Sequence, residues 1–259
     1  MVAVMLDLTP YTLTLEPMTL AARRTLERGV TRQEFLSVEQ APAVLLAQRA
    51  EYPDGIRRAS DGSALILCTT SMPQVTPAMI DWWFGWHLPE SARYRLWHPT
   101  AHVACRVQED RSRLSDARAR YVGNVSYVDE YIGRALARLA IEFKPAASFG
   151  FTELDARGAT AICARTADRV LRSEGGSLVH LVLPVAGGCE MRSAFWLGQV
   201  QSRVPFVGNA VSRLANRPAV RRLIINDRFL LDLFQHCAEE MNHLTRFLPR
   251  AYADLSGSE

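Results

Sequence analysis

The chain has 259 residues, 48% of them hydrophobic, and its 30 basic and 27 acidic side chains give a net charge of +3. A chain of this length buries a sizeable core, and so small and evenly mixed a charge gives no reason to expect nucleic acid or membranes as partners. No apolar run approaches the ~18 residues of a membrane span and no signal peptide is recognisable, so we expect a cytoplasmic protein.

The first part of the chain, residues 1–62, predicts a small helical or irregular segment. Helix-forming patches at 19–28 and 42–51 are interrupted by prolines, and neither shows the alternation of a strand. The main domain is expected to cover residues 63–259. It begins with an apolar, β-compatible stretch at 63–70.

A helix is expected after this stretch. Thr76 is a good N-cap, and Pro77 suits the first helical position. The apolar side chains of this helix are Met79, Ile80, Trp83, Phe84 and Trp86.

The pattern then changes to strands and ends with a long helix. The last helix is predicted over about 228–246, with Asp227 as a plausible cap and Pro249 as its end. Turn formers at 157–158, 174–176 and 187–188 separate short segments rich in β-branched or aromatic residues. These strand segments are 102–108, 121–127, 139–143, 159–164, 178–184 and 191–197.

Several antiparallel strands followed by one long C-terminal helix indicate an α+β fold. In such a design the helix packs across a curved sheet. A cavity between helix and sheet is then the natural place for a ligand.

The residue types and motifs of the chain argue against several common classes of enzyme chemistry. Lys144 is the only lysine, so Schiff-base catalysis has a single candidate. The five cysteines are widely spaced and never form a CxxC pair, which argues against a disulfide framework or a cysteine zinc site. No GxSxG, P-loop or GxGxxG pattern supports serine hydrolase, nucleotide triphosphatase or dinucleotide chemistry.

Histidines and glutamates offer a metal site instead. His236 and Glu240 are four residues apart, so on a helix both side chains leave the same face. Another carboxylate, Glu130, follows an apolar strand, and His98 precedes a proline. Each of these signals alone is common by chance, but two imidazoles and two carboxylates would balance a divalent ion in a buried pocket. His180 lies in the middle of an apolar strand, where a lone histidine is most often a core residue.

Three segments carry a family resemblance. Residues 71–87 contain Trp-Trp-Phe-Gly-Trp-His, residues 93–99 end in Leu-Trp-His-Pro, and residues 121–133 contain Tyr-Val-Gly-Asn and Asp-Glu-Tyr-Ile-Gly. Together they resemble the 2,4-diacetylphloroglucinol hydrolase family, which includes phloretin hydrolases. The resemblance runs from about residue 65 to about residue 250.

This resemblance implies a zinc-dependent hydrolase that cleaves the carbon–carbon bond between an acyl group and a phenolic, phloroglucinol-like ring. It implies a helix-grip fold, like that of the Bet v 1 and START proteins, with an added N-terminal segment. One Zn²⁺ per chain would be held at the positions that match the family's ligands. These are His98, Glu130, His236 and Glu240, and His180 matches a pocket histidine that takes part in proton transfer.

The substrate would be a small aromatic ketone. Trp83 and Trp86 are candidates to line its pocket, together with Trp82 and Trp97, although packing in the core is at least as plausible for these rings. Where the family has an asparagine and a tyrosine as substrate anchors, the nearest positions here are Ala101, with His102 beside it, and Phe195. His102 and Phe195 are therefore candidate substrate contacts, and the departure puts acetylphloroglucinol itself in doubt.

Two alternatives remain open from the sequence. One is a helix-grip carrier of an apolar aromatic or polyketide ligand without metal chemistry. The other is a polyketide cyclase or decarboxylase on the same scaffold. Assembly as a homodimer is also left open.

Overall fold

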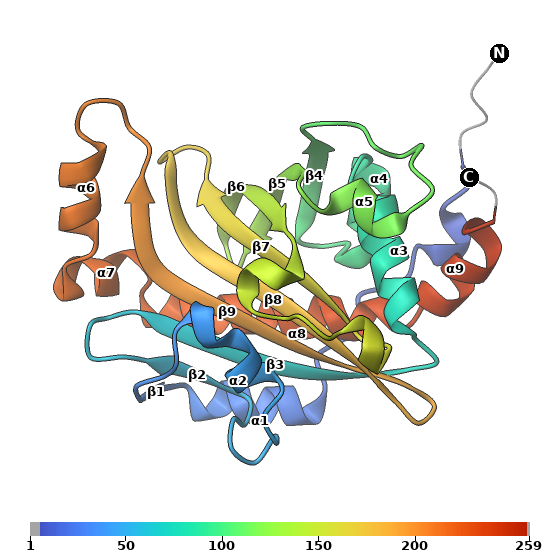
Figure 1. Ribbon diagram of the computed structural model, residues 1–259, viewed down its shortest axis with the longest axis horizontal. Helices are drawn as coiled ribbons and strands as arrows, with labels where there is room; N and C mark the ends of the chain where they lie inside the picture. The colour runs from blue at the N-terminus through green and yellow to red at the C-terminus, as the bar shows by residue number, and fades with distance from the viewer. Residues whose placement is uncertain (1–5, 258–259) are drawn as a thin grey trace.

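The computed structural model describes residues 6–257, which contain one nine-stranded sheet (Figure 1). The strand order is β1-β2-β3-β9-β8-β7-β6-β5-β4; β1 and β2 are parallel, and all other neighbours are antiparallel. The strands are β1 (Val30–Arg32), β2 (Gly55–Arg58), β3 (Ala64–Pro73), β4 (His102–Val107), β5 (Val125–Ile132), β6 (Ala135–Lys144), β7 (Thr160–Asp168), β8 (Ser173–Val185) and β9 (Gly188–Ser202).

Nine α-helices are seen over the same residues. They are α1 (Leu20–Arg28), α2 (Ala41–Leu45), α3 (Pro77–His87), α4 (Ser91–Trp97), α5 (Ala117–Tyr121), α6 (Gly208–Ala215), α7 (Pro218–Ile224), α8 (Asp227–Leu244) and α9 (Leu248–Leu255). Short 3₁₀ turns occur at Thr9–Tyr11, Val38–Gln40, Ala146–Phe149 and Asp155–Arg157.

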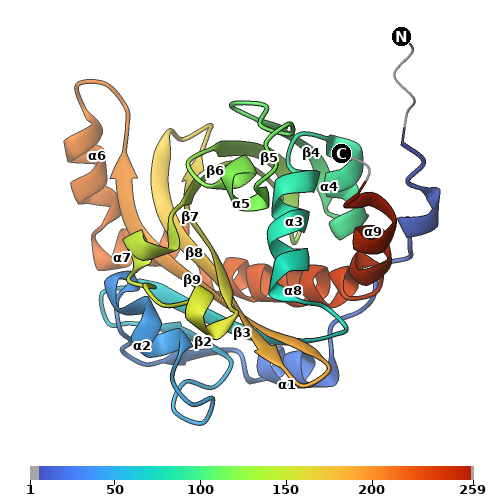
Figure 2. The ribbon, with the colours of Figure 1, turned by 45° about the vertical axis from the view of Figure 1, so that its right-hand side comes forward.

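The long helix α8 lies along the concave face of the sheet. It contacts β1, β2 and β3 toward one edge and β5 toward the other, so the sheet curves around it. Figure 2 shows α3, α4 and α9 gathered around the C-terminal end of α8. This arrangement confirms the expected α+β helix-grip design.

The caps of the two main helices follow from local chemistry. The Thr76 side chain accepts a hydrogen bond from Met79 N at the start of α3, as predicted. At α8 the cap is Asn226, whose side chain accepts from Phe229 N, one residue before the predicted cap. Pro249 does not end α8 but belongs to the first turn of α9, where a proline costs no helical hydrogen bond.

The sheet is covered on both faces. On the concave face, α3, α8 and α9 bury the larger core, which includes Trp83, Phe234 and Met241. The outer face is covered by a second core, to which the N-terminal residues Val38 and Leu45 contribute.

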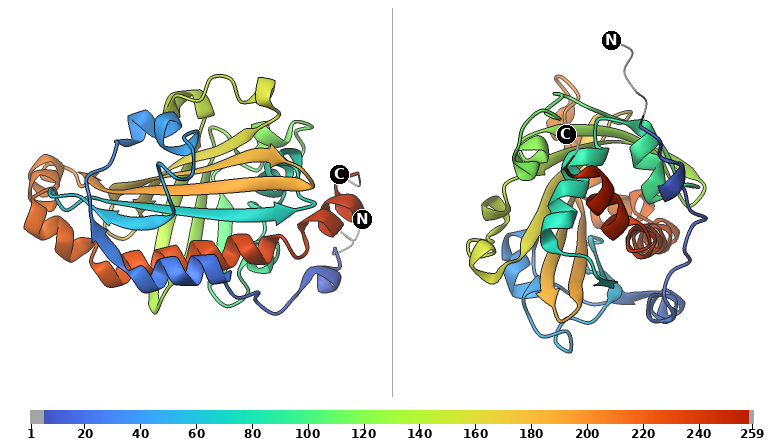
Figure 3. Two further views of the ribbon diagram at one scale, coloured as in Figure 1. Left: turned by 90° about the horizontal axis from the view of Figure 1, so that it is seen from below. Right: turned by 90° about the vertical axis from the view of Figure 1, so that its right-hand side faces the viewer.

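Residues before 63 are part of this architecture. β1 and β2 are strands of the same sheet, and α1 packs beside α8 (Figure 3). The domain boundary that we expected after residue 62 falls at the turn between β2 and β3, which are paired strands. The first sixty residues therefore extend and cover the sheet rather than forming a separate appendage.

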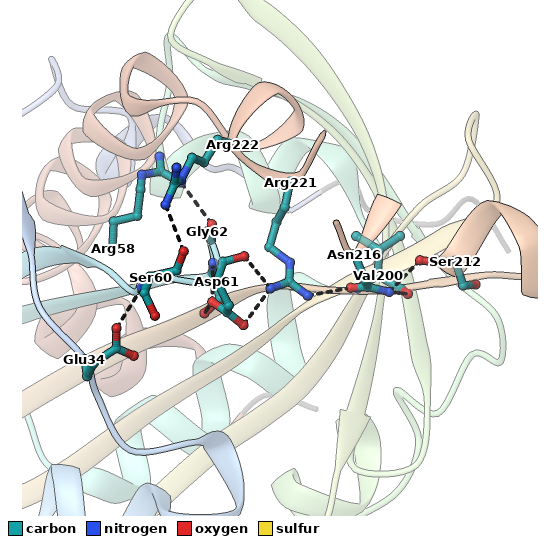
Figure 4. Close-up of polar contacts among 11 residues, drawn as sticks. Glu34, Arg58, Ser60, Asp61, Gly62, Val200, Ser212, Asn216, Arg221 and Arg222 are labelled. Atoms are coloured by element: carbon teal, nitrogen blue, oxygen red, sulfur yellow. Dashed lines mark hydrogen bonds and ion pairs between the residues drawn. The ribbon is translucent and has the colours of Figure 1, made fainter. Parts of the chain in front are cut away.

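Polar contacts fasten α6 and α7 to the β2–β3 turn (Figure 4). Arg221 donates to both the backbone and the carboxylate of Asp61, and also to Asn216 Oδ1. Gly62 has a φ of +84°, and a Cβ there would meet Pro218 O at 2.8 Å, so this close approach requires glycine. Nearby, Arg58 donates to Ile225 O, just before α8. These contacts fix the N-terminal end of α8 against the sheet.

Candidate active site

Two histidines and two glutamates meet under the C-terminal half of α8. His102 Nε2 lies 3.4 Å from His236 Nε2, 3.5 Å from Glu240 Oε2 and 3.8 Å from Glu130 Oε2. His236 Nε2 is 3.6 Å from Glu240 Oε2. All four side chains are buried. The ligand atoms of His102, His236 and Glu240 all lie within 4.8 Å of one another, close enough to share one metal ion.

The elements place these groups in different ways. His236 and Glu240 are one turn apart on α8, as predicted from their spacing. His102 begins β4 and is paired with Glu130 of β5 in the sheet register, so both side chains reach the same face. Tyr94 of α4 supports both, because its ring stacks on His102 at 3.8 Å and its hydroxyl donates a short hydrogen bond to Glu130.

The tautomer of His102 follows from its contacts. Its Nδ1 lies 3.0 Å from the Tyr94 carbonyl oxygen, which can only accept, so Nδ1 carries the proton. The lone pair of Nε2 therefore points toward the cluster. A metal-binding histidine is commonly oriented by a hydrogen bond of this kind at its other nitrogen.

His98, which we expected as the first metal ligand, occupies a different place. Its Nε2 lies 3.5 Å from Glu239 Oε2, and its ring stacks on that of His236 with centroids 4.8 Å apart. The reason is that His98 caps the end of α4, whereas His102 lies in β4 opposite Glu130. The structure thus brings His102, rather than His98, next to Glu130 and Glu240. Glu239 is half-buried and paired with His98.

The charges of the cluster are mutually dependent. Burial opposes charging of His236, but the carboxylates of Glu240 and Glu130 dominate and raise its pKa to about 9. Burial also opposes ionisation of Glu240, yet the neighbouring charge of His236 dominates and lowers its pKa. Burial lowers the pKa of His102. Two buried carboxylates with two imidazoles suit a divalent cation, because neutral histidine nitrogens and ionised carboxylates are its usual ligands.

A cavity of about 150 Å³ extends from this cluster between α8 and the sheet. Glu130, His236 and Glu240 line one end of it. The remaining wall is largely apolar and includes Val128, Leu139, Phe143, Leu178 and Phe195. An enclosed apolar site with a few polar groups at one end is typical of small-molecule pockets.

His180 and Phe195 line this cavity from adjacent strands. The His180 Nδ1 atom lies 2.8 Å from Ser193 Oγ, which orients the ring. Burial lowers the pKa of His180 to about 4, so its imidazole is neutral at pH 7.

Trp83 and Trp86 do not line the cavity. Their rings are buried in the core, where Trp83 packs against Phe247 and Trp86 stacks on Trp82. The side of α3 that faces the cavity carries Phe84 and His87 instead. Of the four tryptophans that we considered, Trp97 lines the cavity.

Sequence reasoning missed several cavity residues. His87 gave no signal because α3 is buried from Ile80 to His87, and Tyr94 gave none because the short helix α4 mixes exposed and buried positions. Ser126 could have been found from the alternation in β5, where Ser126, Val128, Glu130 and Ile132 point inward.

The sequence model of the family described as the DAPG hydrolase PhiG domain matches residues 36–253. The chain belongs to this family. The match begins in the N-terminal segment, well before the point at which we recognised the resemblance, and includes every residue of the cluster and the cavity wall.

Two relatives agree with this assignment. A 2,4-diacetylphloroglucinol hydrolase from a Pseudomonas species is 32% identical over 193 residues, which are 70% of this chain and 64% of that protein. Phloretin hydrolase from Eubacterium ramulus is 28% identical over 232 residues, which are 87% of this chain and 81% of that enzyme. The chain thus spans slightly less than two thirds of the length of the first relative.

Solved structures give only a weak likeness. Ara h 8.0201 is 10% identical, with a TM-score of 0.35 over 68% of this chain and 99% of that chain. Norcoclaurine synthase from Thalictrum flavum is 12% identical, with a TM-score of 0.33 over 63% of this chain and 87% of that chain. No functional conclusion follows from values this low. Separately, none of the helices within residues 6–257 is both long and apolar enough to cross a membrane.

Proposed function

We propose that the protein is a zinc-dependent hydrolase that cleaves the carbon–carbon bond between an acyl group and a phenolic ring. The observation that carries the proposal is the buried cluster of His102, His236 and Glu240, with Glu130 beside it, at one end of an apolar cavity. The relatives named for acylphloroglucinol and phloretin hydrolysis support the same substrate class.

The proposed ligands of one Zn²⁺ per chain are His102, Glu130, His236 and Glu240. A bound zinc ion would polarise the acyl carbonyl or lower the pKa of a bound water molecule. Tyr94 holds the Glu130 carboxylate and the His102 ring in place. The apolar wall, with Phe195 and Leu178, takes the aromatic ring and keeps bulk water away from it.

His180 is the proposed proton carrier. Because its imidazole is neutral at pH 7, it begins as a base and accepts the proton of a phenolic hydroxyl ortho to the acyl group. It then returns this proton to the ring carbon that bears the acyl group, and the ring takes up its keto form. Water adds to the acyl carbonyl, the carbon–carbon bond breaks, and its electron pair returns to the ring as a stabilised enolate. One proton of the added water stays on the carboxylic acid and the other passes to the enolate oxygen, which gives the shortened phenol, so atoms and protons balance.

Turnover of acylphenols tests the reaction. Purified protein is incubated with monoacetylphloroglucinol, diacetylphloroglucinol and phloretin, and released acetate or arylpropionate is measured. We expect release from at least one of them. Glu240→Ala should remove activity, whereas Glu239→Ala, one residue away on the same helix, should retain most of it. No product from any acylphenol would contradict the proposal.

Metal content separates this function from the carrier and from other reactions on the same scaffold. We expect about one tightly bound zinc per chain, as in other sites with four protein ligands. Less than half an equivalent would favour a carrier. Zinc together with turnover of a polyketide, but of no acylphenol, would favour a cyclase or decarboxylase. The homodimer stays a prediction, which light scattering of the purified chain tests.

A further inference from the structure

Ser126 places a buried hydroxyl group in the wall of the cavity. Its side chain belongs to the inward face of β5 and is 0% exposed. Within residues 6–257 its Oγ atom has no hydrogen-bond partner, although the residue lines the cavity. Most buried hydroxyls in folded proteins are satisfied, so an exception beside a cavity indicates a group that a ligand satisfies.

The paired residues on the neighbouring strands offer the Ser126 hydroxyl no polar side chain. Its paired neighbours in the sheet are Val107 on β4 and Ile141 on β6, both apolar. Ile141, Val128 and Phe143 continue the apolar wall around it. The hydroxyl is therefore one of few polar points on a largely apolar wall, Thr166 being another, and such points are how binding pockets fix the orientation of a ligand.

The position of Ser126 relative to the metal cluster defines what it can bind. Ser126 and Glu130 are four residues apart on the same face of β5, with Val128 between them. Four residues of an antiparallel strand span roughly 13 Å between Cα atoms, and a glutamate side chain reaches part of the way back along that span. A ligand held at the cluster by its acyl carbonyl therefore presents the opposite end of its ring to Ser126.

We propose that Ser126 forms a hydroxyl-binding subsite that recognises a phenolic oxygen on the ring carbon para to the acyl group. This inference rests on the proposed function, because that function places the acyl carbonyl at the cluster. The hydroxyl of Ser126 can donate to the phenolic oxygen or accept its proton. A ligand that lacks this oxygen leaves the Ser126 hydroxyl unpaired and is discriminated against, since the loss of a hydrogen bond inside a dry pocket is costly.

Two ketones and one substitution isolate this contact. 2,4,6-Trihydroxyacetophenone carries the para hydroxyl, and 2,6-dihydroxyacetophenone lacks it while keeping both ortho hydroxyls. We expect Ser126→Ala to lower kcat/KM for the first ketone by about tenfold, the size of one neutral hydrogen bond, and to leave the second unchanged. The para hydroxyl has the same electronic effect on the reaction in the wild type and in Ser126→Ala. The preference for the first ketone over the second, compared between the two proteins, therefore reports the contact alone.

Ser177→Ala is the matched control. Ser177 is also a buried strand serine, but its hydroxyl accepts from Arg165 and it does not line the cavity around Ser126. Its replacement should leave the preference between the two ketones unchanged. The thermal midpoint of Ser126→Ala should be at or above that of the wild type, because the substitution removes an unsatisfied buried group.

Binding of both ketones by equilibrium dialysis keeps the test separate from catalysis. Wild type that prefers the trihydroxy ketone, with a preference lost in Ser126→Ala, supports the subsite even when neither ketone is turned over; in that case only the proposed hydrolysis fails. Equal losses on both ketones, or no loss on either, overturn the subsite. Binding of neither ketone to the wild type overturns it as well.

Discussion

His98 and His102 lie four residues apart, and their ring nitrogens face different carboxylates. His102 Nε2 approaches Glu130 and Glu240, whereas His98 Nε2 approaches Glu239. His98 therefore contacts the cluster by stacking its ring on that of His236, and its own Nε2 does not face Glu130 or Glu240.

Replacement of the two histidines separates these roles. His102→Ala should lower bound zinc from about one equivalent to a small fraction, because it removes one of about four ligands. His98→Ala should keep more than half of the metal, since it removes only the support of Glu239 and His236. Metal analysis after gel filtration measures both. Retention of zinc in His102→Ala together with its loss in His98→Ala would restore the ligand set expected from the sequence.

The pH dependence of turnover tests His180 as the base. A base must be neutral to accept a proton, and burial lowers the pKa of His180 to about 4. We therefore expect kcat/KM to stay level from pH 7 to about 5 and to fall about tenfold per unit below pH 4. Circular dichroism at each pH controls for unfolding. An acidic limb near pH 6.5, the usual value for a solvated histidine, would contradict a buried base.

The site was only partly predictable at this scale, for a physical reason. The relation of His236 to Glu240 depends on helical periodicity alone, which the sequence contains. The choice between His98 and His102 depends on where α4 ends and on the pairing of β4 with Glu130, which is a long-range property. Likewise, the orientation of α3 depends on packing against α9, a helix that we did not predict, with Trp82 against Tyr252 and Trp83 against Phe247 just before α9.

Among the elements, α3 is tied to its neighbours through one buried carboxylate. Asp81 Oδ1 accepts hydrogen bonds from Tyr121 of α5 and Thr160 of β7, and Oδ2 accepts from Arg118. Asp81 thus joins two helices and a strand beside the cavity residues Phe84 and His87.

Asp81→Ala should cost about 3–5 kcal/mol of unfolding free energy, because it leaves buried donors and a partly buried guanidinium without their acceptor. Urea denaturation measures the loss. Asp155→Ala is the matched control, since Asp155 pairs with the same arginine but its side chain is 82% exposed. The control should change stability by less than about 1 kcal/mol. Equal effects of the two substitutions would show that Asp81 does not join these elements.

The elements themselves were predicted where local chemistry is strong. Thr76 with Pro77 marked the start of α3, and the C-terminal segments of the sheet were found within a few residues. β5 begins four residues later than expected because Ala117–Tyr121 forms α5. Gly175 does not form a turn but lies at a register shift within β8, where a glycine-containing bulge bends the strand. β1 is a short edge strand and β2 is the short strand between β1 and β3, and both are defined by their pairing partners rather than by their sequences.

For the whole molecule, a metal ion bound at the cluster would couple metal binding to folding. It draws one side chain from β4, one from β5 and two from α8, elements that are distant in the chain, so an ion bound to all four joins the edge of the sheet to the helix that it surrounds. The unfolded chain holds no such arrangement. A metal ion bound at this place would therefore stabilise the folded state by mass action.

Removal of the metal should accordingly lower the thermal midpoint. At a free zinc concentration about a thousandfold above Kd the stabilisation is about 4 kcal/mol. For a chain of this size that corresponds to roughly 8–16 °C, at 2–4 °C per kcal/mol. Scanning calorimetry with and without a zinc chelator measures the shift, which added zinc should reverse. Glu240→Gln, which removes one ligand charge at nearly constant volume, should show a much smaller response to the chelator. A midpoint that is the same in chelator and in zinc would mean that the four side chains do not share an ion.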